Sequence, residues 1–241
     1  MKNNRVMKVF VTALSLMMVM GLTFFADASV THAAKKKSAK VQSTNTTMPC
    51  DFGAEQNKNA DIYAWIQVPG TKINYPILQS ETDNYYLNRN VDLSKGYPGC
   101  IYTNKVHAKD FSSFFTVLYG HNMNNGSMFG TLHKFDDADF FNSHDTMYVY
   151  MPGKKLTYQI YATQRHNDLY LPDEYSASNP NAKQSFVDMS LASTGDSMCH
   201  VREGASVTTD DKIIVLATCC GKDANHRFLV FGKLTGEEDA K

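Results

Sequence analysis

Hydrophobic residues form one long run near the N-terminus of the chain and recur afterwards in short segments. The run from Val9 to Ala26 carries no charged residue, and Lys2, Arg5 and Lys8 precede it. A basic start followed by an uncharged run of this length is typical of export, either as a membrane anchor or as a secretory signal that is cleaved. The length favours the anchor. We therefore expect residues 1–27 to anchor the protein in the cell membrane as a single pass, with the rest of the chain extracellular; secretion after signal cleavage is the alternative.

The segment that follows is polar and poor in large apolar residues. Residues 28–53 include the stretch KKKSAKVQSTNTTMP, which cannot bury enough apolar surface to fold. We expect a flexible linker here, and a folded domain over residues 54–237. The linker would hold that domain away from the membrane.

The pattern of the folded part predicts a mainly β structure. A short helical start is expected around residues 60–65, followed by β-rich segments that Pro69-Gly70 and Pro76 interrupt. Residues 117–119 and 147–150 read as strands, and residues 156–163 follow the turn signal Pro152-Gly153 as the return arm of a hairpin. Residues 213–218 and 228–233 form the last expected pair of strands.

A long segment, residues 168–208, separates these two groups of strands. Within it, residues 181–192 place apolar side chains at helical spacing after Pro180, which predicts an amphipathic helix. Long insertions on a β scaffold often build substrate grooves, and surface decoration is the equally open alternative.

Charge and length narrow the class of protein. The 241 residues suit one domain with an appendage, and 24 basic residues balance 24 acidic ones. No basic tract is interleaved with aromatic residues, so nucleic acid is not an expected partner.

The cysteines point to a free thiol. Their number is odd and their spacing irregular: Cys50, Cys100, Cys199, Cys219 and Cys220. A disulfide framework normally shows an even count in a small domain, whereas this domain is large enough for a full core. A reactive thiol is therefore a candidate for the chemistry.

The C-terminal stretch KIIVLATCCGKDANHRFLVFGKL reads as strand, loop, strand. If the two strands pair in antiparallel fashion, Cys219 and Arg227 become neighbours at the mouth of the hairpin. Alternation along the first strand places Cys219 and Cys220 on opposite faces. Only one of the two thiols is therefore expected to face a substrate, and the other to be a small buried residue.

A nucleophilic thiol needs a proton partner, and His121 is the main candidate among eight histidines. It follows the strand FTVLY in a loop where Gly120 and Gly126 permit a tight, exposed turn. His226 is nearer to the hairpin, but its place beside Arg227 makes it face the opposite way on strand alternation.

Several motifs in order resemble the sortase family, and class B in particular. They are WIQVPGTKINYPILQ, DNYYL, GCIYTN, LYGHNM, GSMFGTLHKF and VLATC followed by HRFLVFGKL, and they span roughly residues 60–234. Two positions depart from the family pattern: Val215 stands where the Thr-Leu-x-Thr-Cys signature begins, and Cys220 follows the nucleophile. The Thr-Cys signature selects Cys219 over Cys220.

The resemblance implies a closed, eight-stranded sortase-type β-barrel with an N-terminal helical segment and a helix-containing insertion before the cysteine strand. It also implies that Cys219 attacks the threonine carbonyl of an NPxTG-like or LPxTG-like sorting signal on a surface protein. By the same resemblance His121 exchanges protons, Arg227 donates to the substrate backbone or the oxyanion, and Thr218 adds a hydrogen bond to substrate. The acceptor would be an amine of a peptidoglycan precursor or of another surface protein, and no metal or organic cofactor is expected.

Three other interpretations remain open from the residues. A zinc site could use His121, Cys219, Cys220 and His226, although adjacent cysteines are poor tetrahedral partners. A cell-wall cysteine hydrolase would share the acyl-enzyme and differ only in resolving it with water. A non-catalytic surface module would bury Cys219 and leave Arg227 as a solvated edge charge.

Overall fold

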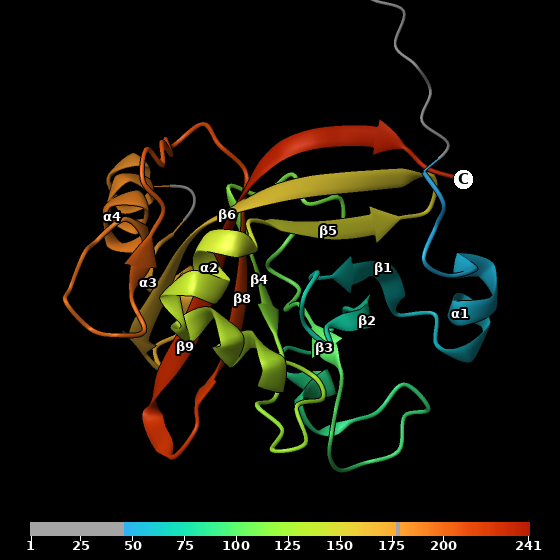
Figure 1. Ribbon diagram of the computed structural model, residues 1–241. Helices are drawn as coiled ribbons and strands as arrows, with labels where there is room; N and C mark the ends of the chain where they lie inside the picture. The colour runs from blue at the N-terminus through green and yellow to red at the C-terminus, as the bar shows by residue number, and fades with distance from the viewer. Residues whose placement is uncertain (1–45, 177–178) are drawn as a thin grey trace, which may run out of the picture. The chain divides into compact units, whose positions relative to one another are not determined.

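The computed structural model describes residues 46–176 and 179–241, and its strands close into a barrel (Figure 1). Eight strands form the closed sheet in the order β5-β1-β2-β3-β4-β8-β9-β6, and β6 pairs again with β5. A short further strand, β7, pairs with β6 outside this ring. The strands are β1 (Ile62–Gln67), β2 (Asn74–Leu78), β3 (Ile101–Tyr102), β4 (Phe115–Tyr119), β5 (Thr146–Met151), β6 (Lys154–Asn167), β7 (His200–Val201), β8 (Ile213–Cys220) and β9 (Asp223–Asp239). The predicted mainly β, eight-stranded barrel is confirmed.

Two neighbouring strand pairs of the barrel are parallel, and one of them decides where the chemistry lies. Strands β2 and β3 run parallel, as do β4 and β8, which are in register from Phe115 opposite Ile213 to Tyr119 opposite Ala217. Parallel strands place their carboxyl ends at the same edge of a sheet. The loop that follows β4 and the end of β8 therefore meet, although about a hundred residues of chain separate them.

The helices are short and lie around the barrel. They are α1 (Phe52–Lys58), η1 (Tyr85–Asn88), η2 (Gly130–Asp136), α2 (Ala138–Ser143), α3 (Leu171–Glu174) and α4 (Pro180–Ser190), of which η1 and η2 are 3₁₀ helices. The helical start expected at residues 60–65 is wrong. Asp51 caps α1 by accepting a hydrogen bond from the Ala54 amide, so the helix begins earlier. Strand β1 buries alternate residues over the expected helical segment, which is the period of a strand.

The two ends of the described chain lie together. Thr46 forms a β-bridge with Ala240, and the Met48 amide donates to the carbonyl of Lys241 at 3.1 Å. The boundary expected at residue 54 falls inside α1, and β9 continues to Asp239, past the boundary expected at residue 237. Part of the expected linker thus belongs to the folded unit.

The core has two main layers, one inside the barrel and one outside it. The outer layer packs the insertion helix α4 on strands β4, β8 and β9, with the Phe186 ring stacked on Phe115 at a centroid distance of 4.5 Å. Figure 1 shows α3 and α4 together on the flank of the barrel away from α1. The predicted helix within the insertion is confirmed, and it covers the outer face of the cysteine strand.

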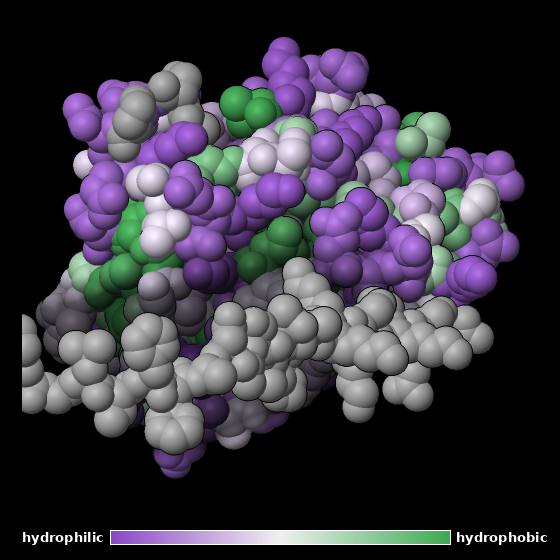
Figure 2. All heavy atoms as spheres, turned by 90° about the horizontal axis from the view of Figure 1, so that it is seen from above, coloured by the Kyte–Doolittle hydropathy of each residue, from purple (hydrophilic) through white to green (hydrophobic). Residues whose placement is uncertain are grey.

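The surface seen from above this view is largely hydrophilic, with hydrophobic residues in separate small groups (Figure 2). Within residues 46–176 and 179–241, no helix has the length and apolar character that crossing a membrane requires. The expected anchor, residues 1–27, lies outside the described residues.

Candidate active site

At the end of β8 the two adjacent cysteines face opposite sides of the strand, as strand alternation predicted. Cys220 joins Leu216 in the interior core of the barrel and is only 7% exposed. Burial raises the pKa of the Cys220 thiol to about 11, so this thiol stays protonated and unreactive at neutral pH. Cys219 faces the other way and is partly exposed. Only Cys219 is therefore placed to meet a substrate.

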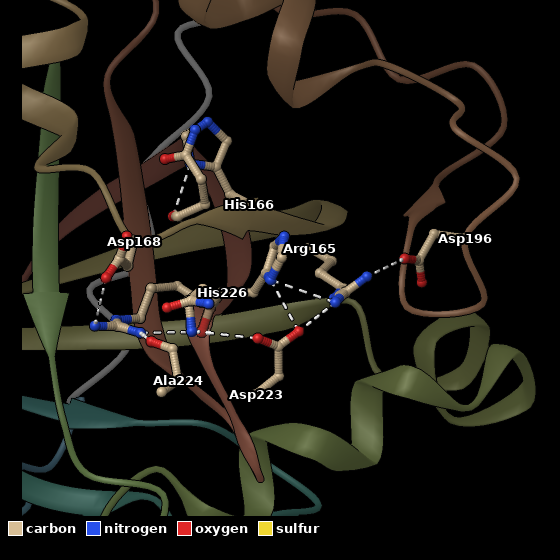
Figure 3. A network of polar contacts seen from close by, with 10 residues as sticks. Arg165, His166, Asp168, Asp196, Asp223, Ala224 and His226 are labelled. Carbon is tan, nitrogen blue, oxygen red and sulfur yellow. Dashed lines mark hydrogen bonds and ion pairs between the residues drawn. The ribbon is translucent and has the colours of Figure 1, made fainter.

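Arg227 is the direct cross-strand partner of Cys219. The register then shifts, because Cys220 pairs with Asp223 and the intervening residues of β9 bulge away from β8. The Arg227 Nη1 donates to the carbonyls of Ala224 at 2.9 Å and His226 at 3.0 Å, while Nη2 lies 3.9 Å from Asp168 Oδ2 (Figure 3). Carbonyls of its own strand thus hold the guanidinium, and Arg227 lines the same cavity as Cys219.

His121 lies two residues after the end of β4 and lines the same cavity as Cys219. Its Nε2 is 2.8 Å from the carbonyl oxygen of Leu87, in η1. Because a carbonyl only accepts, Nε2 carries the proton in this contact, and in the neutral ring Nδ1 is the nitrogen left to take up a proton. The ring also packs against Tyr97, at a centroid distance of 4.8 Å. These contacts fix both the plane and the tautomer of the imidazole.

One cavity of about 330 Å³ brings these residues together. Its lining includes Cys219, His121 and Arg227, with Thr218 on the same wall. The first residues of the long insertion also line it, so one end of that insertion belongs to the cavity even though α4 covers the barrel elsewhere. The cavity joins a thiol, an imidazole and a fixed positive charge, which is a set of groups suited to acyl transfer through a thioester.

The comparisons with known proteins agree with this chemistry. A family model described as the sortase domain matches residues 66–235, which is well over half of the chain. The chain belongs to the sortase family. Sortase B of Listeria monocytogenes is 29% identical over 215 residues, covering 88% of this chain and 84% of that protein.

Solved structures place the likeness in class B. The crystal structure of Bacillus anthracis sortase B is 31% identical, with a TM-score of 0.63 over 76% of this chain and 83% of that one. A Staphylococcus aureus sortase B–substrate complex is 25% identical, with a TM-score of 0.65 over 76% and 84%. The class B resemblance is confirmed. Sortases of this class are cysteine transpeptidases.

Thr218 is buried and bonded to the loop that carries His121. Its side chain is 2% exposed, and its hydroxyl donates to the carbonyl of Gly120 at 2.8 Å. A hydroxyl has a single proton to donate, and here the backbone next to His121 receives it. The contact ties the histidine loop to the nucleophile strand. The hydrogen bond from Thr218 to substrate that the resemblance implies stays a prediction.

Two residues that the sequence did not single out bind the nucleophile's backbone. The Asn122 Nδ2 donates to the carbonyl of Cys219 at 3.0 Å, and the His133 Nε2 contacts the same oxygen at 2.9 Å. Asn122 stands beside His121 in the motif LYGHNM, which was the available signal. His133 lies in the motif GSMFGTLHKF, and nothing in its sequence context distinguished it from the other seven histidines.

His226 faces away from the cavity, as alternation predicted. Its Nδ1 lies 2.8 Å from Asp223, which also pairs with Arg165, and Arg165 reaches Asp196 at 3.4 Å (Figure 3). The hydrogen bonds from His226 and Arg165 hold the pKa of Asp223 down to about 2. The four residues of the zinc alternative do not converge. Among the described residues, no group of three or more histidine, cysteine, aspartate or glutamate side chains is placed to hold a metal ion.

A second cavity, of about 570 Å³, is larger but lacks this chemistry. It is lined mainly by apolar residues of β2 and of the segment before β3, and it includes Cys100. Burial, with a smaller effect of Asp92, raises the pKa of the Cys100 thiol to about 12. Among the described residues that line it there is no histidine, so the smaller cavity is the candidate active site.

Proposed function

We propose that this sortase cuts an NPxTG-like or LPxTG-like sorting signal of surface proteins between threonine and glycine. The threonine acyl group passes to the Cys219 sulfur and then to an amine of a peptidoglycan precursor or of another surface protein. The observation that carries this proposal is the single cavity that Cys219, His121 and Arg227 share. The solved Staphylococcus aureus sortase B is a substrate complex, which supports substrate binding by this fold.

Each residue would have a separate role in the cycle. The Cys219 sulfur attacks the threonine carbonyl, and the carbon–nitrogen bond to glycine breaks. His121 takes the thiol proton as the sulfur attacks and gives it to the departing amine; it later takes a proton from the incoming amine and returns it to the Cys219 sulfur. The Nη1 of Arg227 is occupied by two backbone carbonyls, so we assign Nη2, on the cavity side near Asp168, to the oxyanion or the substrate backbone.

The rim of the cavity suits an extended peptide with apolar side chains. Leu87 and Leu169, both lining residues, are 37% and 59% exposed, and Tyr97, which packs on His121, is 69% exposed. Exposed apolar side chains around a polar catalytic group are typical of peptide and ligand sites. We assign the apolar positions of the sorting signal to this rim.

We also propose that residues 1–27 anchor the protein in the cell membrane and that the barrel works on the extracellular side. The uncharged run from Val9 to Ala26 and the basic residues before it support this arrangement. An anchored enzyme would meet its substrates where exported surface proteins and wall precursors leave the membrane.

The test uses the full-length chain in detergent and fluorogenic peptides of both signal types, with and without an oligoglycine amine. We expect cleavage between threonine and glycine, an amine-linked product, and loss of both in Cys219→Ala. Cys220→Ala is the matched control, because it removes an adjacent but buried thiol, and it should retain cleavage. Cleavage without any amine-linked product would instead indicate a hydrolase, and equal activity in Cys219→Ala would exclude this nucleophile.

A further inference from the structure

The carbonyl oxygen of Cys219 lies where β8 loses its neighbour. The last backbone bond on this side runs from the Gly120 amide to the carbonyl of Ala217, at 3.2 Å. Carbonyls alternate along a strand, so the Cys219 carbonyl points to the same side, where β4 has already ended at Tyr119. Two side chains take the place of the missing strand, because Asn122 and His133 both reach this oxygen.

His133 is held from three sides. Its Nε2 contacts the Cys219 carbonyl at 2.9 Å, its Nδ1 contacts Asp136 Oδ2 at 2.9 Å, and its ring stacks on Phe228 of β9 at a centroid distance of 4.9 Å. A carbonyl accepts hydrogen bonds only, and so does a carboxylate. Both ring nitrogens must therefore carry protons for both contacts to form, which makes the ring an imidazolium.

The surroundings of His133 favour the charged ring. Burial opposes the charge, but the hydrogen bond to Asp136, the bond to the Cys219 carbonyl and the negative charge of Asp136 outweigh it, so the pKa of His133 lies above its ordinary value of 6.5. Lys134 and Asp137 share the open depression beside this pair. His200 of β7 contacts the backbone carbonyl of Asp136 at 2.9 Å.

Strands β8 and β9 add little charge on the remaining sides. From β8, the neighbouring thiol of Cys220 is protonated at neutral pH, since its pKa is raised to about 11. From β9, Phe228 contributes an uncharged ring face. Asp136 is therefore the main charged partner of His133.

We propose that His133 is a positioning residue for the nucleophile: as an imidazolium held by Asp136, it fixes the peptide unit of Cys219 and so the direction of the thiol into the cavity. A neutral ring has one proton and can serve only one of its two acceptors. The carboxylate is the stronger acceptor, so deprotonation breaks the His133 bond and leaves the Cys219 carbonyl held by Asn122 alone. Transpeptidation then declines as the pH rises through the pKa of His133. The kinetic part of this inference rests on the proposed function.

The protonation state is tested without any activity, by NMR of the full-length chain with ¹⁵N-labelled histidine in detergent. His133→Gln assigns the signals. We expect both ring nitrogens of His133 to be mostly protonated at pH 6.5, where an ordinary imidazole is half deprotonated, and the ring to lose a proton at higher pH. Asp136→Asn should move that transition to lower pH. A ring that titrates at or below 6.5 in the wild type overturns the proposal.

Peptide cleavage then tests the positioning role. His133→Phe keeps the stacked ring but loses both donors, and we expect kcat to fall roughly tenfold, with a small change in KM, for one lost charge-assisted hydrogen bond. His133→Gln keeps an amide donor for the Cys219 carbonyl, so it should restore most of kcat and lose the alkaline decline. Asp136→Asn should shift the decline to lower pH. His144→Gln is the control, because His144 also stacks on a phenylalanine, Phe140, but its ring makes its hydrogen-bond contacts with Ser143 and the Phe140 carbonyl and none with Cys219.

Two outcomes separate this inference from the proposed function. If the wild type cuts peptides and the His133 and Asp136 variants match its kcat and its alkaline limb, the positioning role is refuted. If the wild type cuts no peptide, the proposed function fails, and the pH profile of iodoacetamide alkylation at Cys219, measured by mass spectrometry, replaces cleavage as the readout. A profile that is the same in wild type and His133→Gln refutes the inference there too.

Discussion

Thr218 and Thr116 make a matched pair for testing how the histidine loop is held. They lie on the neighbouring parallel strands β8 and β4 and are 2% and 1% exposed. The Thr218 hydroxyl donates to the Gly120 carbonyl at 2.8 Å, whereas the Thr116 hydroxyl finds no hydrogen-bond partner among the described residues. Substitution by valine keeps the branched shape of both side chains. Only Thr218→Val removes a hydrogen bond.

The expected stability changes follow from that difference. Thr218→Val should lower the free energy of unfolding by about 1–3 kcal/mol, because the Gly120 carbonyl loses its donor in a partly buried place. For a domain of this size, each kcal/mol corresponds to about 2–4 °C in Tm. Thr116→Val removes a buried hydroxyl without a partner, so its stability should be unchanged or higher.

The catalytic effect should appear in kcat. Gly120 precedes His121 directly, so a loosened loop displaces the imidazole from Cys219, and small displacements of a catalytic group are costly. We expect Thr218→Val to lower kcat roughly tenfold, with little change in KM, and Thr218→Ser to recover most of it. Urea unfolding and peptide-cleavage kinetics measure the two effects.

The result that would refute this reasoning is specific. A Thr218→Val enzyme as stable as the wild type, with KM raised and kcat preserved, would mean that the hydroxyl binds substrate, as the sequence predicted. An equal loss of stability in Thr116→Val would mean that the change of side chain itself, without the hydrogen bond, causes the loss.

Three further predictions concern the loop, the insertion and acid stability. Gly120→Ala would place a methyl group 2.5 Å from Ile101 Cδ1 and 2.7 Å from Phe129, so thermal unfolding should show a loss of about 1–3 kcal/mol, together with a lower kcat. Phe186→Ala should cost about 3–5 kcal/mol in urea unfolding; the kcat of the folded fraction should stay near that of the wild type, because this ring belongs to the outer core layer. Burial lowers the pKa of His107 from 6.5 to about 4, so its contribution to stability is present above pH 6.5 and is lost as the pH falls toward 4; His107→Asn should remove about 3 kcal/mol of that pH dependence in unfolding measured across this range.

The sequence by itself determined which residues face one another locally. Alternation along β8 separated Cys219 from Cys220, and the hairpin with β9 placed Arg227 opposite Cys219. The same alternation turned His226 away from the cavity. These conclusions needed only the period of a strand and the reversal of a hairpin, and both are properties of short stretches of chain. The ordered motifs added the family and the barrel.

Only the tertiary structure decided which distant groups meet at the nucleophile. The partners of Thr218 and of the Cys219 carbonyl lie 86–98 residues away along the chain. The parallel pairing of β4 with β8 brings them together, and no local periodicity encodes that pairing. Because β4 ends at Tyr119, three residues before Asn122, the Cys219 carbonyl needs side-chain donors, and the position of η2 makes His133 one of them. The hydrogen-bond partners of the Cys219 carbonyl therefore depend on where β4 ends. The closed barrel sets that position.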